Sequence, residues 1–421
     1  MNQIIINGGK SLNGEIWVAG NKNAVLPCLA ASIMTKETSI FHNVPDIEDV
    51  KSCIEILVDL GVDVQRPDAH TLVINPMALN KFELNPNLVA KLRASILFLG
   101  PLLARTRQAV MRHPGGCIIG RRPVGTHFEA IRMLGGNVTT TEDNYIASLS
   151  SERKSEVFLD EVSVTATENA MCLAASLVGK TVIMGAACEP HIVNLAHYLI
   201  AMGAKIKGAG TNRIEIEGTT ELHGAEHHIA YDFIETATFA FMAAATQGEV
   251  TIHNAVEEDF HMIGVYLKSF GSSFEFVDNN TLVVKPATLH SPTNIKEIQT
   301  RPWPGFPSDA MSPMIVLATQ ASGMTLFHEW MYEGRLLFTD MLVAMGANII
   351  TCDPHRVIVS GITALRSKNL VSPDIRAGVA LVLAGLLADG TTVIDNAHLV
   401  RRGYENIANR LAGLGADIRE N

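Results

Sequence analysis

One pattern recurs six times along the 421-residue chain, and it limits the folds that the sequence can adopt. In each copy the end of an amphipathic helix is followed by a glycine and a short strand. The copies read LVDLGVDV, IRMLGGNV, LIAMGAKI, LKSFGSSF, LVAMGANI and LAGLGADI, and their glycines are Gly61, Gly135, Gly203, Gly271, Gly346 and Gly415. Because glycine readily adopts the left-handed conformation that ends a helix, each copy predicts a helix C-cap before a strand. The glycines lie 68 to 75 residues apart, which indicates repeated supersecondary units and not a solenoid.

A second helix in each repeat is apolar on every side and rich in small residues. These helices read NAVLPCLAASIM, ASILFLGPLLA, NAMCLAASLVG, TATFAFMAAAT, MSPMIVLATQA and AGVALVLAGLLA. A helix of this kind belongs in the interior of a domain. A β-branched strand that ends in a polar turn also recurs, as TSIFHNVP, QAVMRHPGG, TVIMGAACEP, EVTIHNAVEE, MTLFHEWMYE and TTVIDNAHLV. We therefore expect two strands and two helices per repeat, with one helix central and one at the surface.

The number of repeats predicts the number of domains. Three repeats that close around their own buried helices make one domain, so six make two. With 421 residues, of which 47% are hydrophobic, the chain can build two cores of ~200 residues each. The predicted fold class is α/β.

Composition and charge narrow the classes of protein to which the chain can belong. The net charge of −10 does not suit a nucleic-acid partner. No apolar stretch reaches the ~18–20 residues that cross a bilayer, and the start MNQIIINGGKSLNG is unlike a secretory signal, so we expect no membrane association. The 6 cysteines form no CxxC pair and have no histidines at zinc spacing, which favours a reduced, cytoplasmic, metal-free protein. No feature indicates an obligate protein partner.

The buried helices carry polar residues at their N-terminal ends. Capping accounts for the Ser, Thr, Asp and Asn residues at these ends. It does not account for Lys22, Arg93 and Arg376, because the helix dipole disfavours positive charge there. If the helix ends of each domain share one face, two opposed faces form a cleft suited to anions. We therefore expect an anionic small-molecule substrate.

Six segments, spread from end to end of the chain, carry a resemblance to a known family. They are GNKNAVLPCLAA, LRASILFLGPLLAR, HPGGCIIGRRP, GFPSD, PDIRAGVALVLAGLLA and RRGYENIANRLAGLGADI. On these segments the chain resembles the enolpyruvyl transferases, and PGGCxIGxRP is similar to the Cys-bearing loop of the branch that uses a UDP-sugar. The resemblance implies two inside-out α/β barrel domains of three repeats each. The implied domains are 22–229, which carries the Cys117 loop, and 1–21 plus 230–421, with the active site in the cleft between them.

The resemblance also implies a reaction. The enolpyruvyl group of phosphoenolpyruvate (PEP) passes to a hydroxyl of UDP-N-acetylglucosamine, with release of phosphate, in the first committed step of peptidoglycan synthesis. The hydroxyl adds to C2 of PEP while C3 takes a proton, and the tetrahedral ketal then loses phosphate and a C3 proton. This chemistry needs an acid, a base, and cations for a phosphate and a carboxylate, but no cofactor. Arginine suits the cationic role because its planar fork binds both oxyanions.

The resemblance assigns these roles residue by residue. Cys117 resembles the residue that protonates C3 and that epoxide mimics of PEP such as fosfomycin alkylate. Asp309, Asp374 and Lys22 are similar to the other catalytic residues. The implied PEP- and phosphate-binding residues are Lys22, Arg122, Arg335, Arg376 and Arg402. The implied acceptor-binding residues are Asn23, Arg93, Arg122, Pro123, Val124, Ser163, Val164, Thr165, Glu189, Asp309 and Met331.

Each of these residues also has a structural interpretation. Cys117 could be a small buried hydrophobe, but the glycines before it and the arginines near it describe an electropositive loop that favours a reactive thiol. Asp309 and Asp374 could act only as N-caps. His127 could be a structural histidine as easily as a site residue.

Several residues depart from the pattern of the family. They are Gly125, Thr126, Thr165, Phe233 and Ala237 on the nucleotide side, and Gly334 and Arg401 near the PEP clamp. In the pattern of the family, an arginine stands at the position of Phe233. Three functions therefore stay open: transfer to UDP-N-acetylglucosamine, transfer to a different acceptor such as another nucleotide, and binding without catalysis. The third is disfavoured by the intact set of Lys22, Cys117, Arg122, Asp309, Arg335, Asp374 and Arg402.

Overall fold

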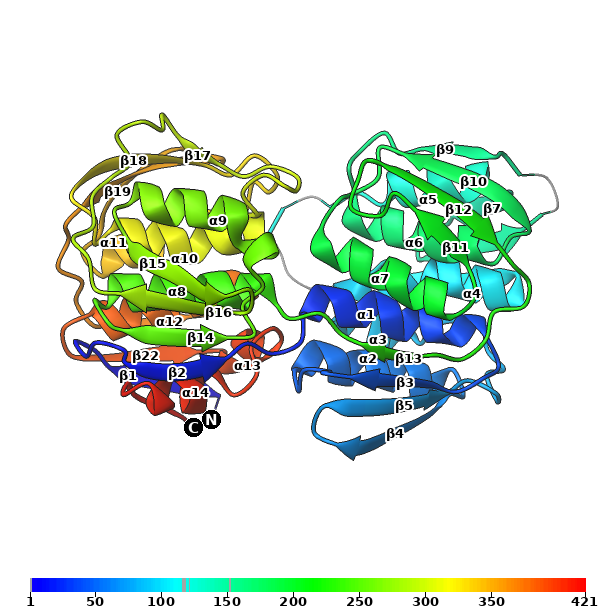
Figure 1. Ribbon diagram of the computed structural model, residues 1–421, viewed down its shortest axis with the longest axis horizontal. Coiled ribbons are helices and arrows are strands. Elements are labelled where there is room, and N and C mark those ends of the chain that lie inside the picture. Colours follow the sequence, from blue (N-terminus) through cyan, green and yellow to red (C-terminus); the bar gives the residue numbers. More distant parts are fainter. Residues whose placement is uncertain (1, 116–118, 121, 151–152) are drawn as a thin grey trace. The chain divides into compact units, whose positions relative to one another are not determined.

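The computed structural model describes residues 2–115, 119–120, 122–150 and 153–421 (Figure 1). The chain divides into two units. Unit 1 contains residues 2–19 and 231–421 together with Ile119 and Gly120, and unit 2 contains residues 20–115 and 122–230. Cys117 lies outside the described residues.

Unit 1 consists of strands and helices from both ends of the sequence. Its strands are β1 (Gln3–Asn7), β2 (Gly14–Trp17), β14 (Val250–His253), β15 (Ser273–Asp278), β16 (Thr281–Lys285), β17 (Ile298–Gln299), β18 (Gly323–His328), β19 (Asn348–Asp353), β20 (Arg356–Gly361), β21 (Asn369–Val371), β22 (Thr391–Asp395) and β23 (Asp417–Glu420). Its helices are α8 (Phe233–Ala245), α9 (Glu257–Ser269), α10 (Ser308–Ala318), α11 (Thr339–Ala344), α12 (Ile375–Leu387), α13 (Ala397–Arg401) and α14 (Ile407–Gly413).

Unit 2 is built from the segment between them. Its strands are β3 (Ser39–His42), β4 (Asp63–Asp68), β5 (Thr71–Asn75), β6 (Gln108–Arg112), β7 (Gly136–Thr140), β8 (Asn144–Leu149), β9 (Glu156–Phe158), β10 (Gly179–Met184), β11 (Lys205–Lys207), β12 (Arg213–Gly218) and β13 (Glu226–His228). Its helices are α1 (Lys22–Ala31), η1 (Ser32–Met34), α2 (Glu48–Asp59), α3 (Pro86–Lys91), η2 (Arg93–Phe98), α4 (Leu99–Thr106), α5 (Gly125–Met133), α6 (Val164–Ala175) and α7 (Pro190–Ala201).

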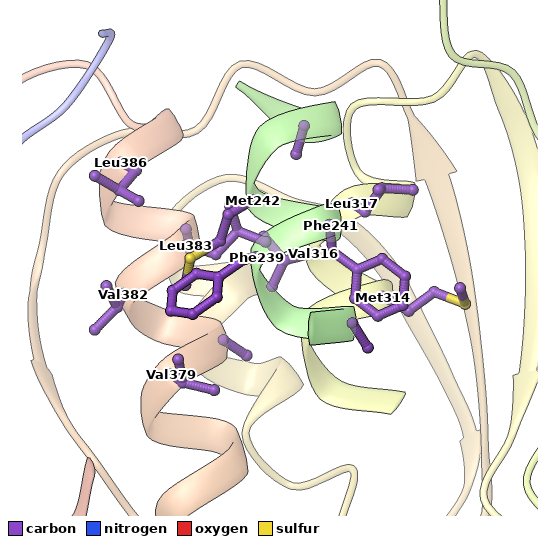
Figure 2. Close-up of a cluster of buried hydrophobic side chains, with 14 of the residues drawn as sticks. Phe239, Phe241, Met242, Met314, Val316, Leu317, Val379, Val382, Leu383 and Leu386 are labelled. Atoms are coloured by element: carbon purple, nitrogen blue, oxygen red, sulfur yellow. The ribbon is translucent and has the colours of Figure 1, made fainter. Parts of the chain in front are cut away.

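The apolar helices are the cores of the two units, as predicted. In unit 1, α10 packs between α8 and α12, and Figure 2 shows Phe239 and Met242 of α8 near Leu383 of α12, with Met314 projecting from α10. Every residue of α8 is buried, and α12 is buried almost throughout. In unit 2, α1 and α6 are buried in the same way. The second apolar segment of unit 2 is divided into η2 and α4.

Each central helix of unit 1 packs against its own sheet (Figure 1). Helix α8 lies on β14 and β16, α10 lies on β20, and α12 lies on β1 and β22. The strand orders are β15-β16-β14-β2, β17-β18-β20-β19 and β21-β22-β1-β23, and in each sheet one edge strand is short and parallel to its neighbour while the others are antiparallel. In unit 2 the orders are β13-β3-β5-β4, β11-β12-β10-β9 and β6-β8-β7. The α/β class is therefore confirmed, and in the described residues the sheets stay separate and none closes into a barrel.

The prediction of two strands per repeat is wrong, because the strand after five of the six glycines turns back as a hairpin, whereas the strand after Gly415, β23, pairs with β1. Three of these hairpins share one turn, in which an aspartate Oδ1 accepts the backbone N–H two residues later at 2.8 Å. The pairs are Asp68 with His70, Asp278 with Asn280, and Asp353 with His355. A register shift lies directly before each aspartate. The returning strand adds a third antiparallel strand to the repeat.

The six glycines behave as the sequence predicts. All six have positive φ, from 80° at Gly271 to 113° at Gly203, and each lies between a helix and the next strand. In this region of φ an L-residue with a Cβ is strained. The repeat is therefore fixed by backbone geometry at six equivalent positions.

None of the helices in the described part of the chain has the length and apolar character needed to cross a membrane.

Gly413 and Gly415 offer a matched test of the C-cap. Neither would bring an added Cβ within 4 Å of other residues, but only Gly415 has a positive φ, of 91°. We expect Gly415→Ala to lower the free energy of unfolding by about 1 kcal/mol, because alanine is strained there. Gly413→Ala lies in α14 and is expected to raise it by up to ~1 kcal/mol. Urea unfolding measures both variants, and effects of the same sign would contradict the cap.

Candidate active site

The N-terminal ends of the three central helices in unit 1 carry aspartates. Asp232 caps α8 and accepts the N–H groups of Ile234 and Glu235 at 2.9 and 3.3 Å. Asp374 caps α12 in the same way, with N–H distances of 2.8 and 3.0 Å. Asp309 lies in the first turn of α10. Asp374 is therefore the N-cap of α12, while Asp309 caps no helix and has other partners.

Asp309 joins two buried arginines. Its Oδ1 lies 3.0 Å from Nη2 of Arg335, and its Oδ2 lies 2.8 Å from Nη2 of Arg376. The arginine side chains are only 3% and 4% exposed, whereas that of Asp309 is 30% exposed. Asp374 Oδ1 completes the cluster at 3.8 Å from Nη1 of Arg335. The structure thus brings together four of the residues that the sequence assigned to catalysis and PEP binding.

The two guanidinium groups stay charged in spite of their burial. Burial lowers the pKa of each group, but the nearby carboxylates, Asp309 first, outweigh this effect, so the pKa of Arg335 and of Arg376 lies above its usual value. The same surroundings act on Asp232, where burial raises the pKa to about 6 although Arg376 opposes the shift. The two arginines are therefore fixed cations that are paired with carboxylates, and the fork of a guanidinium can also bind an anionic group of a ligand.

Tyr404 fixes the position of the Arg376 side chain. Its Oη accepts a hydrogen bond from Nη1 of Arg376 at 3.0 Å and lies 2.9 Å from Oγ1 of Thr238 on α8. Tyr404 is fully buried, and its ring lies 5.4 Å from the guanidinium carbon. The sequence analysis missed this residue, although it follows Arg402 by two positions in RRGYENIA.

Glu329 positions the segment that leads to Arg335. It is completely buried at the end of β18, and its Oε1 accepts Thr300 Oγ1 and the N–H of Met331, both at 3.0 Å. Its Oε2 accepts the hydroxyl of Ser308 at 2.8 Å. Met331, predicted to bind the acceptor, is therefore fixed through its backbone. No signal in the sequence pointed to Glu329, because its partners come from segments that are far apart.

Arg402 and the two departures near the clamp also lie in unit 1. Arg402 is half-buried and follows the last turn of α13. Arg401 pairs with Glu420 of β23, so this departure has a structural role. Gly334 donates its N–H to the carbonyl of Ile119 at 3.0 Å, and a Cβ on it would lie 2.8 Å from the carbonyl carbon of Ile119. The close approach explains glycine at this position.

In unit 2, the first residues of α1 carry Lys22 and Asn23. The Nζ of Lys22 lies 2.7 Å from Oδ2 of Asp49, and both side chains are largely buried. Asn21 caps the helix, accepting the N–H of Asn23 at 2.7 Å. A negative charge that compensates Lys22 is thus present within the unit itself, on Asp49 of α2.

The Arg93 side chain forms hydrogen bonds with the backbone on both sides of the segment that contains Cys117. Its Nη1 donates to the carbonyl of Pro114 at 3.2 Å, and its Nη2 donates to the carbonyl of Arg122. Pro123 is exposed, and Val124 packs partly against the core directly before α5.

The start of α6 contains three predicted acceptor residues. Ser163 caps the helix, accepting the N–H of Ala166 at 3.4 Å, and Val164 is its first residue. Thr165 Oγ1 lies 3.0 Å from Nε2 of His127. His127 is buried, and burial, followed by the charges of Arg93 and Arg122, lowers its pKa to about 3. The ring is therefore neutral at physiological pH.

Two carboxyl groups lie close together in the interior of unit 2. Glu189 is half-buried directly before α7, and Glu168 on α6 is only 2% exposed. Burial, followed by the proximity of Glu189, raises the pKa of Glu168 well above its usual value. Oε1 of Glu168 has no hydrogen-bond partner within the described structure. Glu168 is therefore protonated in the folded protein over a range of pH in which an exposed glutamate is charged.

A comparison with protein families shows to which family the chain belongs. Residues 6–411 match the family model described as EPSP synthase (3-phosphoshikimate 1-carboxyvinyltransferase). The chain belongs to the EPSP synthase family of enolpyruvyl transferases. The resemblance inferred from the motifs is thereby confirmed.

Relatives within this enolpyruvyl transferase family cover the whole chain. The UDP-N-acetylglucosamine 1-carboxyvinyltransferase of Borreliella burgdorferi is 41% identical over 100% of this chain and 99% of its own length. The protein of the same name from Treponema denticola is 42% identical over 99% of each chain. Among solved structures, the enolpyruvyl transferase NikO from Streptomyces tendae matches 100% of this chain and 99% of its own, with a TM-score of 0.87 and 22% identity. An EPSP synthase from Acinetobacter baumannii matches over 100% of both chains, with a TM-score of 0.74 and 18% identity. These two structures support the fold.

Two further departures of this enolpyruvyl transferase lie on α8. Phe233 is 5% exposed and meets Trp303 edge-on, with ring centroids 5.3 Å apart. Ala237 is completely buried. An apolar ring has thus replaced the arginine of the family pattern and is covered by protein.

Glu168 predicts a measurable dependence of stability on pH. Because its pKa is higher in the folded than in the unfolded state, the folded state binds more protons between the two values. Its contribution to the free energy of unfolding is therefore largest at low pH and decreases as pH rises. Glu168→Gln cannot titrate, so we expect its loss of stability between pH 5 and pH 8 to be smaller than that of the wild type, by on the order of 1 kcal/mol.

The exposed Glu161 in the same unit supplies the control. Chemical unfolding at each pH is expected to give the same profile for Glu161→Gln and the wild type. Profiles that coincide for Glu168→Gln and the wild type would show that Glu168 does not hold its proton.

Proposed function

We propose that the protein transfers the enolpyruvyl group of PEP to a hydroxyl of UDP-N-acetylglucosamine and releases phosphate. The observation that carries the proposal is the pair of buried guanidinium groups, Arg335 and Arg376, held on the partly exposed carboxylate of Asp309. The relatives that are 41% and 42% identical over their full lengths carry the name of this activity. An acid/base carboxylate directly beside two cations is what the reaction needs at the carbon that bears phosphate and carboxylate.

PEP has two anionic groups that the arginines of the unit 1 cluster can bind. It carries a phosphate and a carboxylate, and a guanidinium fork binds either group with two parallel hydrogen bonds. We propose that Arg376 binds the carboxylate, and that Arg335 and Arg402 bind the phosphate together with Lys22 and Arg122. Because Asp309, Glu329 and Tyr404 already hold the arginines, little side-chain entropy is lost when the substrate binds.

The addition and the elimination need proton transfer at two atoms. In the addition, the acceptor hydroxyl attacks C2 of PEP and gives its proton to a base, while C3 receives a proton from an acid. In the elimination, the C2–O bond breaks and its electron pair leaves with phosphate, while C3 gives a proton to a base, which restores the double bond. We assign the base to Asp309, with Asp374 supporting it, and the acid to Cys117. Asp374 already accepts two backbone N–H bonds, so we give it the supporting role in this assignment.

In this proposal the acceptor substrate binds mainly to residues of unit 2. We assign acceptor binding to Asn23, Arg93, Arg122, Pro123, Val124, Ser163, Val164, Thr165 and Glu189, with Asp309 and Met331 of unit 1. The proposal requires both sets of residues to act on the same pair of substrates during turnover. We further propose that each unit is one inside-out α/β barrel of the family, with domain limits at 22–229 and at 1–21 plus 230–421.

One observation favours a different acceptor as the second candidate. Phe233 is buried against Trp303 where the family pattern has an arginine, so a positive charge is missing at the start of α8. A paralogue that modifies another nucleotide would retain the PEP clamp and differ at such positions.

Phosphate release tests the proposal directly. With PEP and UDP-N-acetylglucosamine, we expect the wild type to release one phosphate per enolpyruvyl group transferred, and PEP alone to give none. Asp309→Asn retains the shape of the side chain but removes its charge, and we expect kcat to fall about 100-fold or more. The exposed Asp340 of the same unit supplies the control variant, Asp340→Asn, with unchanged kcat. Release only with another nucleotide would support the second candidate, and no release with any acceptor would contradict both.

Cys117 is tested by alkylation. We expect fosfomycin, an epoxide mimic of PEP, to add its mass to the wild type and to Cys352→Ser, but not to Cys117→Ser. Cys352 is an exposed free thiol in unit 1 and therefore reports on unspecific labelling. Peptide mass spectrometry locates the adduct. Labelling that persists in Cys117→Ser, or that disappears in Cys352→Ser, would remove Cys117 from the assigned role.

A further inference from the structure

An open hollow lies on the surface of unit 1, at one end of the sheet that β15, β16, β14 and β2 form in Figure 1. Its volume is about 500 Å³, which is within the range of sites for small molecules. Among the described residues that line it, none is assigned above to PEP, to the acceptor or to proton transfer. The hollow is therefore separate from the residues of the proposed reaction.

The floor of the hollow is a row of side chains that crosses all four strands. Trp17 pairs with His253, His253 with Thr281, and Thr281 with Asp278. Cross-strand partners lie on the same face of a sheet, and this face is the outer one because the neighbouring Ile252 is buried. An indole, an imidazole, a hydroxyl and a carboxylate thus lie side by side at the surface.

The indole of Trp17 is exposed but held in place. Trp17 is 57% exposed, and its ring stacks on that of His253, with centroids 4.8 Å apart and planes at 20°. Nε2 of His253 lies 2.9 Å from Oε2 of Glu15, which fixes the second ring. The stack therefore offers a rigid apolar surface that is in contact with water until a ligand covers it.

The two other hairpins with the same Asp-centred turn place a histidine ring against the backbone at this point. Nδ1 of His70 lies 3.0 Å from the carbonyl oxygen of Val44, and Nδ1 of His355 lies 2.7 Å from that of Glu329. The equivalent residue of the hollow is Asn280, whose shorter side chain forms no such bond in the part of the chain that the structure describes. The space that an imidazole occupies in the other hairpins is thus left open.

Trp17 is also peculiar to this sheet. The residue that pairs with the equivalent histidine at the strand end is His228 in unit 2 and Gln299 in another sheet of unit 1. An asparagine in a turn or a single exposed aromatic residue is ordinary by itself. Here both departures from the repeat meet at one hollow, although the fold of the repeat requires neither.

The polar groups around the indole match hydroxyl groups better than charged groups. Three asparagines, Asn254, Asn279 and Asn280, supply carboxamides that can both donate and accept hydrogen bonds. The carboxylates are already engaged, Asp278 with the N–H of Asn280 at 2.8 Å and Glu15 with the imidazole. Within the described structure, no lysine or arginine lines the hollow. It therefore suits neither an anion nor a cation.

We propose that the hollow binds a neutral saccharide, with a pyranose ring stacked on Trp17 and its hydroxyl groups hydrogen-bonded to the surrounding asparagines. A pyranose in a β-linked chain has a flat face of C–H groups, which fits an indole. Its hydroxyl groups both donate and accept, as the carboxamides do. The inference goes beyond the proposed function and does not depend on it.

Saturation-transfer-difference NMR of the full chain with N,N′-diacetylchitobiose, a β-linked disaccharide, tests the site. We expect transfer to the protons on one face of a pyranose ring, with a Kd on the order of 1 mM. Trp17→Ala is expected to raise the Kd about 10-fold or more, because the stacking surface is lost. The control is Trp330→Ala, which removes another exposed tryptophan of unit 1 and is expected to leave the Kd unchanged. No transfer to the wild type, or equal affinity of Trp17→Ala and the wild type, would overturn the inference.

Exchange of the turn residue tests the hollow without removing the indole. Asn280→His gives this hairpin the residue that the other two hairpins already have, so the fold is retained, and we expect the Kd to rise about 10-fold as the ring fills the space. His70→Asn makes the reverse change in unit 2, where no tryptophan is equivalent, and is expected to create no second site. If Trp17→Ala does not fold, Asn280→His decides, and an unchanged Kd in that variant counts against the proposal.

Excess UDP-N-acetylglucosamine distinguishes the hollow from the acceptor site, because it contains the same sugar as the probe. We expect the saturation transfer to N,N′-diacetylchitobiose to persist in its presence. Loss of the transfer would locate the disaccharide in the acceptor site and remove the saccharide site from the hollow. Failure of the proposed transferase reaction would leave the expected binding to Trp17 unchanged, so the two failures are distinguishable.

Discussion

A helix that is apolar on all sides has to be covered on all sides, and this demand determines where polar chemistry can occur in each unit. In unit 1, α8, α10 and α12 pack on one another and each is covered by a different sheet. Their sides are therefore closed to solvent and substrate. Only their ends remain for polar groups, and Asp232, Asp309 and Asp374 all lie at N-terminal ends. The candidate PEP site is a consequence of how the core is covered.

Two charged guanidinium groups inside a protein impose a second constraint. An unpaired buried charge is strongly unfavourable, so Arg335 and Arg376 need carboxylates in fixed positions. The same aspartates also satisfy backbone N–H groups, as at Asp374, or link two cations, as at Asp309. Stability and the proposed catalysis thus depend on the same few atoms. Changes at this cluster are therefore expected to alter folding and activity together, and the two effects have to be measured separately.

The parts of the structure that depend on local sequence could be predicted, and those that depend on distant partners could not. The six C-cap glycines and the buried helices follow from backbone preference and apolar pattern, and both are confirmed. The third antiparallel strand was missed because its Asp-centred turn looks like an ordinary polar loop in the sequence. Tyr404 was missed because its partners lie on α8 and α12, far away along the chain. His127 was left undecided because its hydrogen-bond partners, Thr165 and Asn169, lie on the next helix of the unit.

The place of β1 has a consequence for biosynthesis. This strand lies between β22 and β23, and it pairs with both along most of its length. It precedes unit 2 in the sequence, whereas both of its neighbours follow unit 2 and are therefore translated later. All residues of unit 2 are translated before β22 and β23, so unit 2 can fold during elongation while β1 still lacks both of its partner strands. Its isoleucines Ile4 and Ile6, which are buried in the folded protein, stay unpaired and uncovered until then, and transiently exposed apolar residues of this kind promote aggregation.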